Sequence, residues 1–540
     1  MIDLRNAFVA LDEYYDRKMT VDNVPGMALA ITDREQTLHR RSIGYSDLAS
    51  RAKVTDETLF QIGSISKSFT AIALLQQSER GKLDLHAPVN EYLPWFRVKS
   101  EHPPITLHHL LTHTAGIPIG TDSTIAAESE VWHLRELEAS APPGELFHYS
   151  NTGYKALGLV LEAVTGMTCS EAVMKGVVEP LGMTRTFASI TNDLRKATAV
   201  GYTWLHDDRP AGRKAELAPA VWLESTSADG AISSVSEDMA AYIRMLLRRG
   251  TGPDGRIITE KSFELLTDRY IKPLDGYHGE SYGYGLNIED NSGHQFVWHT
   301  GGMVGYTSSM LMDMDLGIGM IILTNSLSGP DDMSRHSIQV MRAAAEGIPL
   351  PEAVVNPHAH MPENPEKYIG SYEGDTTVIG ISVKDKLLVA EVGGEAFVLE
   401  GLREDHYILD APSFHRYPLR FVRVGDEVIG LVHGPDTYSL KPYTGRSSPP
   451  TAPEGWSAFV GHYRSHNPWM FSFRVVLRDG LLVFIDPSAG EEPMVPLSDG
   501  SFRIGEDPRS PERIRFDMVI GGKAFRACLP GGCLHRSFVE

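Results

Sequence analysis

Cysteine is scarce in this chain, and its scarcity excludes a fold built on disulfides. Only three of the 540 residues are cysteines, whereas small disulfide-held secreted folds carry several pairs at regular spacings. Cys528 and Cys533 flank Leu529-Pro530-Gly531-Gly532 and could meet across a turn. We nevertheless expect these two to be reduced thiols, and neither they nor Cys169 lies in a motif typical of a catalytic nucleophile.

Positive charge and long apolar runs are lacking as well. Lysine and arginine number 50 against 70 aspartates and glutamates, and the formal net charge of −20 argues against nucleic acid or an anionic membrane as a partner. No apolar run reaches the roughly 18 residues that a membrane-spanning helix needs, and the first residues show no basic stretch followed by an apolar one. We therefore expect a cytoplasmic protein that binds neither membrane nor nucleic acid.

An α+β order of elements fills the first part of the chain. Residues 24–47 are typical of a β-hairpin, and a mostly helical region follows to about residue 190. Three apolar strands are then predicted, at Gln295–Gly302, Ser308–Met312 and Ile318–Leu323. This order predicts an antiparallel sheet that is flanked by helices and closed by both ends of one domain, which we place at residues 1–347.

The remaining residues predict two repeated β modules. A chain of 540 residues exceeds what one hydrophobic core organises, and proline-rich, aperiodic stretches at 348–366 and 442–455 predict linkers. Three stretches of 367–441 recur in 456–540 at offsets of 91 to 95 residues. The matching pairs are Tyr368–Tyr372 with Phe459–Tyr463, Asp385–Val389 with Asp479–Val483, and Leu419–Phe421 with Ile514–Phe516. Each module is short enough to close as a small antiparallel barrel.

Ser64 and Lys67 lie at the predicted start of a helix. The positions that would share its apolar face are Ile65, Phe69, Ile72 and Leu75, and Gly81 is a plausible stop. Residues at i and i+3 are neighbours on a helix, so the amine can reach the hydroxyl. A helix start also offers unpaired N–H groups to an oxyanion. By itself, however, Ser-x-x-Lys more often marks a helix N-cap with a solvated lysine.

Two further motifs and a pair of histidines follow. Tyr149-x-Asn151 precedes a buried helical pattern, and His299-Thr300-Gly301-Gly302 ends an extended one. His109 and His113 have the i, i+4 spacing of metal ligands, but no glutamate lies between them in a His-Glu-x-x-His pattern, and no third ligand is evident. We interpret them as packing histidines, and we expect no metal or other cofactor.

Taken in order, Ser64-x-x-Lys67, Tyr149-x-Asn151 and His299-Thr300-Gly301 resemble the motifs of the penicillin-recognising serine hydrolases. The nearest subgroup comprises class C β-lactamases, CubicO-type hydrolases, family VIII esterases and D-aminopeptidases. Supporting stretches are Leu110–Gly116, Pro143–Glu145 and Pro180–Met183, and the resemblance covers about residues 10–340. It implies a β-lactamase/transpeptidase-like catalytic domain. The two appended modules are similar to the lipocalin-like barrels of D-aminopeptidases in this superfamily.

The resemblance implies an acyl-enzyme on Ser64. An unassisted serine hydroxyl is a poor nucleophile and needs a base within hydrogen-bond reach. Lys67 and Tyr149 would take and return its proton as a coupled pair, and which of them is the formal base stays open. Asn151 would hold both Lys67 and a substrate carbonyl.

The strand that carries His299 would border the site. Gly301 and Gly302 would allow substrate to approach this strand, and the N–H groups of Ser64 and Gly302 would form the oxyanion hole. β-Lactamases usually carry lysine at the position of His299, to bind a substrate carboxylate. Because histidine is mostly neutral at pH 7, we expect weaker selection for such substrates, and a His299 that orients substrate and helps to poise Tyr149.

These features predict a serine hydrolase with a small-molecule or short-peptide substrate. An aminopeptidase or amidase, with D-amino-acid specificity as one form, is expected ahead of a family VIII carboxylesterase, and a β-lactamase or DD-carboxypeptidase comes third. The non-enzyme alternative is a penicillin-binding sensor, against which the complete Ser64, Lys67 and Tyr149 set argues. A barrel loop lines the active-site entrance in the D-aminopeptidases, and Ser465–Met470 is the candidate here. A homo-oligomer is compatible with these features.

Overall fold

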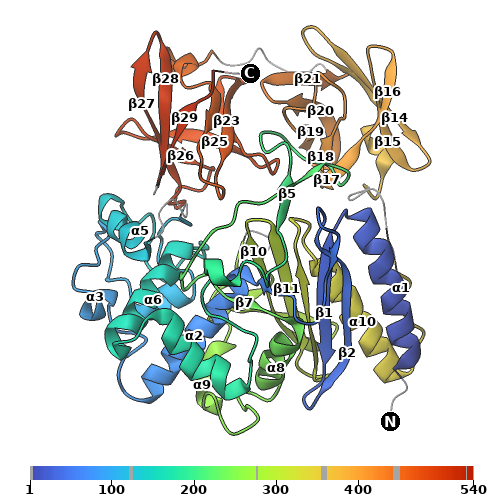
Figure 1. Ribbon diagram of the computed structural model, residues 1–540. Helices are drawn as coiled ribbons and strands as arrows, with labels where there is room; N and C mark the ends of the chain where they lie inside the picture. The colour runs from blue at the N-terminus through green and yellow to red at the C-terminus, as the bar shows by residue number, and fades with distance from the viewer. Residues whose placement is uncertain are drawn as a thin grey trace. The chain divides into compact units, whose positions relative to one another are not determined.

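The chain divides into two compact units. The computed structural model describes residues 4–120, 126–274, 278–353, 355, 362–441, 451–530 and 532–538. One unit is Met1–Thr203 with Ala218–Val355, and the other is Trp204–Leu217 with Asn356–Glu540 (Figure 1). The predicted linkers at 348–366 and 442–455 lie partly outside the described residues.

The first unit is built on an eight-stranded antiparallel sheet. In spatial order its strands are β3 (Ala52–Lys53), β2 (Thr37–Asp47), β1 (Gly26–Thr32), β12 (Ile318–Thr324), β11 (Tyr306–Asp313), β10 (His294–Met303), β9 (Asn287–Asn291) and β8 (Ser281–Tyr282). The predicted hairpin is confirmed as β1 and β2. Met27 of β1 pairs with Thr324 of β12, which confirms that both ends of this domain close one sheet.

Helices cover both faces of this sheet. Alternate side chains of β1 separate the two cores: Leu29 packs with α1 (Arg5–Val21) and α10 (Asp331–Glu346), and Ala30 packs with the helices of the opposite face. The helices of that larger layer are α2 (Ser66–Glu79), α3 (Val89–Tyr92), α4 (Leu107–Leu111), α5 (Ala127–His133), α6 (Asn151–Thr165), α7 (Cys169–Val173), α8 (Ser236–Leu247) and α9 (Glu260–Leu266). There are also two two-stranded sheets among the described residues. One pairs β4 (Phe60–Gln61) with β7 (Ser233–Ser234), and the other pairs β5 (Tyr202–Trp204) with β6 (Leu217–Pro219).

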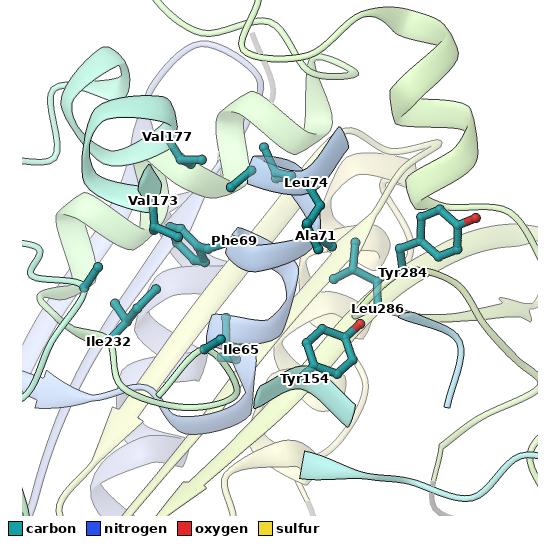
Figure 2. Packing of buried hydrophobic residues seen from close by; sticks show 14 of the residues in the cluster. Ile65, Phe69, Ala71, Leu74, Tyr154, Val173, Val177, Ile232, Tyr284 and Leu286 are labelled. Atoms are coloured by element: carbon teal, nitrogen blue, oxygen red, sulfur yellow. The ribbon is translucent and has the colours of Figure 1, made fainter. Parts of the chain in front are cut away.

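Helix α2 lies at the centre of the larger layer. The sequence predicted one apolar face, but every residue from Ser66 to Gln77 is buried. Figure 2 shows the reason, since Val173 and Val177 lie on one side of the helix and Tyr284 and Leu286 on the other. A helix enclosed on all sides has a fixed position and rotation, and this fixes the residues at its first turn.

Length and composition are the criteria that decide whether a helix can cross a bilayer. Among the described helices, no single one is long and apolar enough to cross a bilayer. One bent pair, Asn151–Thr165 with Cys169–Leu181, meets the criteria jointly, and α6 is largely buried in the core of the first unit.

The second unit contains two β modules. The first is a nine-stranded antiparallel sheet whose edge strands, β16 and β17, follow one another in the chain and flank Leu399, so the sheet is nearly closed. The second is a closed eight-stranded barrel, β22 to β29. The strands of the first are β13 (Gly370–Glu373), β14 (Val378–Lys384), β15 (Leu387–Val392), β16 (Glu395–Val398), β17 (Glu400–Arg403), β18 (His406–Ile408), β19 (Leu419–Val424), β20 (Glu427–His433) and β21 (Asp436–Leu440). Those of the second are β22 (Gly461–Arg464), β23 (Ser472–Arg478), β24 (Leu481–Ile485), β25 (Glu491–Pro496), β26 (Phe502–Ile504), β27 (Arg513–Ile520), β28 (Lys523–Leu529) and β29 (Gly532–Arg536).

Each of the two modules contains the same hydrogen bond at its start, in agreement with the predicted repeat. The Tyr372 hydroxyl donates to the carbonyl of Tyr368 (2.7 Å), and the Tyr463 hydroxyl donates to the carbonyl of Phe459 (2.7 Å). Each pair joins the first strand of its module to the short 3₁₀ helix before it. The two modules therefore begin alike, although the first is a nine-stranded sheet that is nearly closed and the second a closed eight-stranded barrel.

Trp204–Leu217 packs with these modules, although it comes from within the predicted catalytic domain. Asp207 forms an ion pair with Arg464 (2.8 Å), and the Arg213 backbone N–H donates to Glu400 Oε1 (2.7 Å). These contacts join the segment to the second and the first module, respectively. The sequence pattern did not predict that this segment belongs to the second unit. Charge pairs and hydrogen bonds hold it there, and these leave no periodic pattern of apolar residues.

The prediction of reduced thiols at Cys528 and Cys533 is wrong, because the two residues form a disulfide. They lie directly opposite each other on β28 and β29, with Cα atoms 4.0 Å apart. Strand pairing thus sets the register that brings the two sulfurs together. Cys169 is a free, buried thiol whose pKa is raised by burial to about 12, and it is no candidate nucleophile.

Candidate active site

Ser64 and Lys67 meet at the first turn of α2. Ser64 lies in a 3₁₀ turn, Gly63–Ile65, that leads directly into the helix. Lys67 is fully buried, and its Nζ donates to Ser64 Oγ (2.9 Å) and to the carbonyl of Asp229 (2.9 Å). The amine is therefore within hydrogen-bond distance of the hydroxyl, as the catalytic interpretation requires. Because Lys67 is buried, it is not the solvated lysine of a simple helix cap.

Tyr149 lies beside the Lys67 ammonium. The Lys67 Nζ is 4.9 Å from the centre of the Tyr149 ring and 5.6 Å from that of Tyr154, within the range of a cation–π contact. Tyr149 immediately precedes Ser150, the N-cap of α6, whose hydroxyl accepts a hydrogen bond from Gly153 N (3.1 Å). The start of α6 thus places Tyr149 next to the Ser64–Lys67 pair.

Asn151 is the first residue of α6, and its backbone N–H donates to the carbonyl of Ile119 (2.9 Å). The expected bond from Lys67 to the Asn151 amide is not formed, because Asn151 Oδ1 is buried without a hydrogen-bond partner among the described residues. Lys67 donates to Ser64 and Asp229 instead. Asn151 Oδ1 therefore remains an acceptor at the beginning of the helix.

His299, on β10, is 2% exposed and neutral. Its Nδ1–H donates to the carbonyl of Thr300 (2.5 Å), so Nε2 is the acceptor for the hydroxyl of Tyr282 (3.2 Å). Burial, and then the nearby Lys67 charge, lower the pKa of His299 to about 3. The ring therefore supplies no fixed positive charge at pH 7.

Glycines bring β10 against the turn that carries Ser64. A Cβ on Gly301 would lie 1.9 Å from the carbonyl oxygen of Ile62, and a Cβ on Gly63 would lie 2.6 Å from the nitrogen of Gly302. Gly63 has φ of +55°, a conformation that glycine adopts at little cost. The backbones of Gly302 and of the Ser64 turn are thus in the close approach that an oxyanion hole requires.

A cavity of about 460 Å³ opens onto Ser64. Its walls combine the hydroxyl nucleophile with aromatic, imidazole and apolar groups. The lining residues are Ser64, Ile119, Phe147, His148, Tyr149, His278, His299, Thr300 and Gly302. Among these described residues there is no lysine, arginine, aspartate or glutamate, so the lining favours an uncharged group of the substrate.

Comparison with known proteins agrees with this geometry. The family model described as Beta-lactamase matches residues 11–345, which is more than half of the chain. The chain belongs to this family. The matched residues include Ser64, Lys67, Tyr149, Asn151 and the His299–Gly302 stretch.

Relatives in this family share about a quarter of their residues with this chain. Protein flp of Staphylococcus aureus (strain N315) is 26% identical over 330 residues, and the match covers 58% of this chain and 62% of that protein. Penicillin-binding protein 4 of Amycolatopsis lactamdurans is 27% identical over 378 residues, which cover 67% of this chain and 96% of that protein. The octameric penicillin-binding protein homologue from Pyrococcus abyssi matches with a TM-score of 0.60 and 27% identity, over 80% of this chain and 99% of that one.

In this family member His113 packs among aromatic rings, as expected, whereas His109 caps a helix and the two do not have the helical i, i+4 arrangement. His109 belongs to the capping box of α4, where its Nδ1 accepts from the backbone N–H of Thr106 (3.1 Å). Helix α4 ends at Leu111, and His113 has φ of +57°. The two histidines therefore do not share a helix face, and His113 lies next to Tyr149 instead.

Sequence reasoning also missed Phe147 and His278 in the cavity wall. The ring of His278 stacks on Tyr149, with centroids 4.9 Å apart and planes 21° apart. His278 lies 21 positions before His299 but belongs to no motif that the sequence analysis noted. Phe147 lies two residues before Tyr149 and was close to a noted motif.

Proposed function

We propose that this protein is a serine hydrolase that cleaves an amide, peptide or ester bond of a small substrate through an acyl-enzyme on Ser64. An aminopeptidase or amidase is the leading form, with D-amino-acid specificity as one version. The observation that carries the proposal is the 2.9 Å contact between the buried Lys67 Nζ and Ser64 Oγ, with Tyr149 beside the amine.

The reaction follows from this geometry. Ser64 Oγ attacks the substrate carbonyl carbon and gives its proton to the Lys67–Tyr149 pair. The pair can accept this proton when either the amine or the phenol is deprotonated. The carbonyl oxygen becomes an oxyanion that the backbone N–H groups of Ser64 and Gly302 stabilise. The pair then protonates the leaving amine or alcohol, and water releases the acyl group from Ser64 by the reverse proton path.

An uncharged cavity lining favours a carboxylesterase as the second candidate. Among the described lining residues, there is no lysine or arginine for a substrate carboxylate and no aspartate or glutamate for an α-ammonium group. The first absence argues against a β-lactamase or DD-carboxypeptidase. The second favours an amidase over an aminopeptidase within the leading form, and it brings esters level with uncharged amides. Position 299 is a histidine and not a lysine, and this also favours an esterase or amidase over a β-lactamase.

The remaining expectations are proposals about partners and location. A small molecule or short peptide is the proposed substrate and the cytoplasm the proposed location, and the net charge of −20 argues against nucleic acid or an anionic membrane as a partner. A homo-oligomer is supported by the similar Pyrococcus abyssi protein, which is octameric.

A substrate panel tests the function. The panel compares p-nitrophenyl esters, L- and D-aminoacyl p-nitroanilides and a chromogenic cephalosporin, with Ser64→Ala as the matched variant. We expect turnover of anilides or esters by the wild-type protein, and a loss of about 10⁴-fold or more in Ser64→Ala, because the nucleophile is gone. A Ser64→Ala variant that keeps its activity would refute the assignment. Labelling of Ser64 by a fluorophosphonate without turnover of any substrate would indicate a sensor.

His299→Lys tests the contribution of the neutral histidine to specificity. We expect the ratio of cephalosporin hydrolysis to ester hydrolysis to rise about tenfold, since a new ammonium would attract the substrate carboxylate. The ratio is the measured quantity because both activities should fall when a second cation is buried near Lys67. An unchanged ratio would exclude a role for His299 in substrate choice.

A further inference from the structure

His113 is buried and lies directly behind Tyr149. It follows α4 in the Leu110–Gly116 stretch and has φ of +57°, which turns the chain toward the start of α6. Its ring faces the ring of Tyr149, with centroids 4.2 Å apart and planes 34° apart. His113 does not line the cavity, so it is close to the proposed proton-transfer group without being placed to touch substrate.

Two hydrogen bonds connect His113 to the residues on either side of Tyr149. The backbone N–H of His148 donates to the His113 carbonyl (2.8 Å). The backbone N–H of Ser150 donates to His113 Nδ1 (3.0 Å). The backbone of Tyr149 is therefore held at both of its ends by one residue, which fixes the direction of its side chain.

We propose that His113 is a positioning residue that holds Tyr149 against the Lys67 amine, an inference that rests on the proposed function. Two imidazole rings contact Tyr149, that of His113 at 4.2 Å and that of His278 at 4.9 Å between ring centroids. Its ring centre is 4.9 Å from Lys67 Nζ. A shift of the Tyr149 backbone would break this contact and the proton path that depends on it.

The proposal requires one particular protonation state of His113. Because Nδ1 accepts from the Ser150 N–H, the neutral ring carries its hydrogen on Nε2. Nε2 is buried and has no hydrogen-bond partner among the described residues. The ring thus leaves its own N–H without a partner among the described residues while Nδ1 accepts from the Ser150 N–H, so the bond to the Ser150 backbone is the informative feature.

The surroundings keep His113 neutral. Burial, followed by the charges of its neighbours, lowers the pKa of His113 well below its ordinary value. The ionisable groups that face it are Lys67, His148, His278 and His299, and the tyrosines around its ring are Tyr149, Tyr154 and Tyr282. Protonation would place a hydrogen on Nδ1 opposite the Ser150 N–H and would break the bond that holds Tyr149.

The test compares His113→Asn with His113→Gln. The Oδ1 atom of asparagine would occupy the place of His113 Nδ1 and accept from the Ser150 N–H, and asparagine tolerates positive φ. The side-chain oxygen of glutamine is one carbon further from the backbone and would miss this N–H. We expect His113→Gln to lower kcat about 10²-fold, with KM nearly unchanged because His113 does not line the cavity. We expect His113→Asn to regain most of this loss. In the glutamine variant, the limb of the kcat–pH profile that reports the Lys67–Tyr149 pair should move to higher pH, since a displaced phenol loses the stabilising ammonium.

The same substitutions at His336 are the matched control. His336 also packs on a tyrosine, with its ring 4.4 Å from that of Tyr14, but it is a partly buried residue of α10 that faces α1. Neither His336 variant should alter kcat or the pH profile. Equal losses in His113→Asn and His113→Gln, or no loss in either, would overturn the positioning role. A wild-type protein with no turnover and no fluorophosphonate labelling of Ser64 would instead overturn the proposed function.

A measurement on the wild-type protein covers the case in which a variant does not fold. Histidine-specific ¹⁵N labelling reports which ring nitrogen carries hydrogen. We expect the His113 signal, identified by its coupling across the hydrogen bond to the Ser150 N–H, to show hydrogen on Nε2 and to stay neutral as the pH falls to about 5, below the ordinary histidine pKa. A His113 ring that carried its hydrogen on Nδ1 would exclude the Ser150–His113 bond and the proposal built on it.

Discussion

Replacement of Lys67 by methionine is expected to lower kcat/KM by about 10⁴-fold. Lys67 Nζ is 2.9 Å from Ser64 Oγ and 4.9 Å from the centre of the Tyr149 ring, so its loss removes the group that links nucleophile and phenol. Methionine has a similar length and suits the buried site. We therefore expect a melting temperature no lower than that of the wild type, since removing a buried ammonium relieves a desolvation cost.

Lys155→Met is the contrasting control. Lys155 is also buried, on α6, but it forms an ion pair with the buried carboxylate of Glu130. Its replacement removes the cation from that carboxylate and should cost about 3–5 kcal/mol of stability, while kcat of the folded fraction stays near the wild-type value. Ester hydrolysis and thermal denaturation measure both quantities. Activity of Lys67→Met within tenfold of the wild type would contradict a role for Lys67 in proton transfer.

Gly301→Ala is expected to lower kcat by about 10²–10³-fold, the effect of losing one oxyanion-hole donor. The new Cβ would lie 1.9 Å from the carbonyl oxygen of Ile62 and 2.4 Å from Ser308 Oγ. The Ile62 carbonyl is backbone that also accepts from Ser308 Oγ (2.8 Å), so the turn bearing Ser64 must move away from β10. That movement separates the two N–H groups that would bind the oxyanion.

Gly329→Ala is the matched control, because a Cβ there meets no atom within 4 Å and its φ is not in the left-handed region. It should leave kcat and the melting temperature unchanged. Steady-state kinetics and the rate of fluorophosphonate labelling of Ser64 measure the effect of Gly301→Ala. A Gly301→Ala variant that is folded and fully active would show that β10 does not supply the oxyanion hole.

The substrate cavity owes its chemistry to burial. Tyr154 and Tyr282 are fully buried, and desolvation raises the pKa of each phenol well above its ordinary value. The same burial lowers the pKa of His299 to about 3. These flanking groups therefore stay neutral at pH 7, which leaves the Ser64, Lys67 and Tyr149 groups as the chemically active set.

Much of the fold could be predicted because its signals are local. Short apolar runs bounded by turn residues defined the β1–β2 hairpin and the strands β10, β11 and β12, and such local signals do not depend on distant contacts. The repeat at offsets of 91 to 95 residues identified two β modules before their strands were known. The disulfide between Cys528 and Cys533 was missed because only the strand register brings the sulfurs together.

The sequence by itself determined the chemical groups of the site: a serine, a lysine, a tyrosine, an asparagine and a histidine in a recognisable order. Tertiary structure alone decided how they are arranged. Packing on all sides of α2 buries Lys67 against Ser64, close approach at Gly301 sets β10 beside them, and His113 reaches Tyr149 across 35 intervening positions of the chain. Such contacts are long-range, and their outcome depends on which groups are desolvated together, a property that no single stretch of sequence carries.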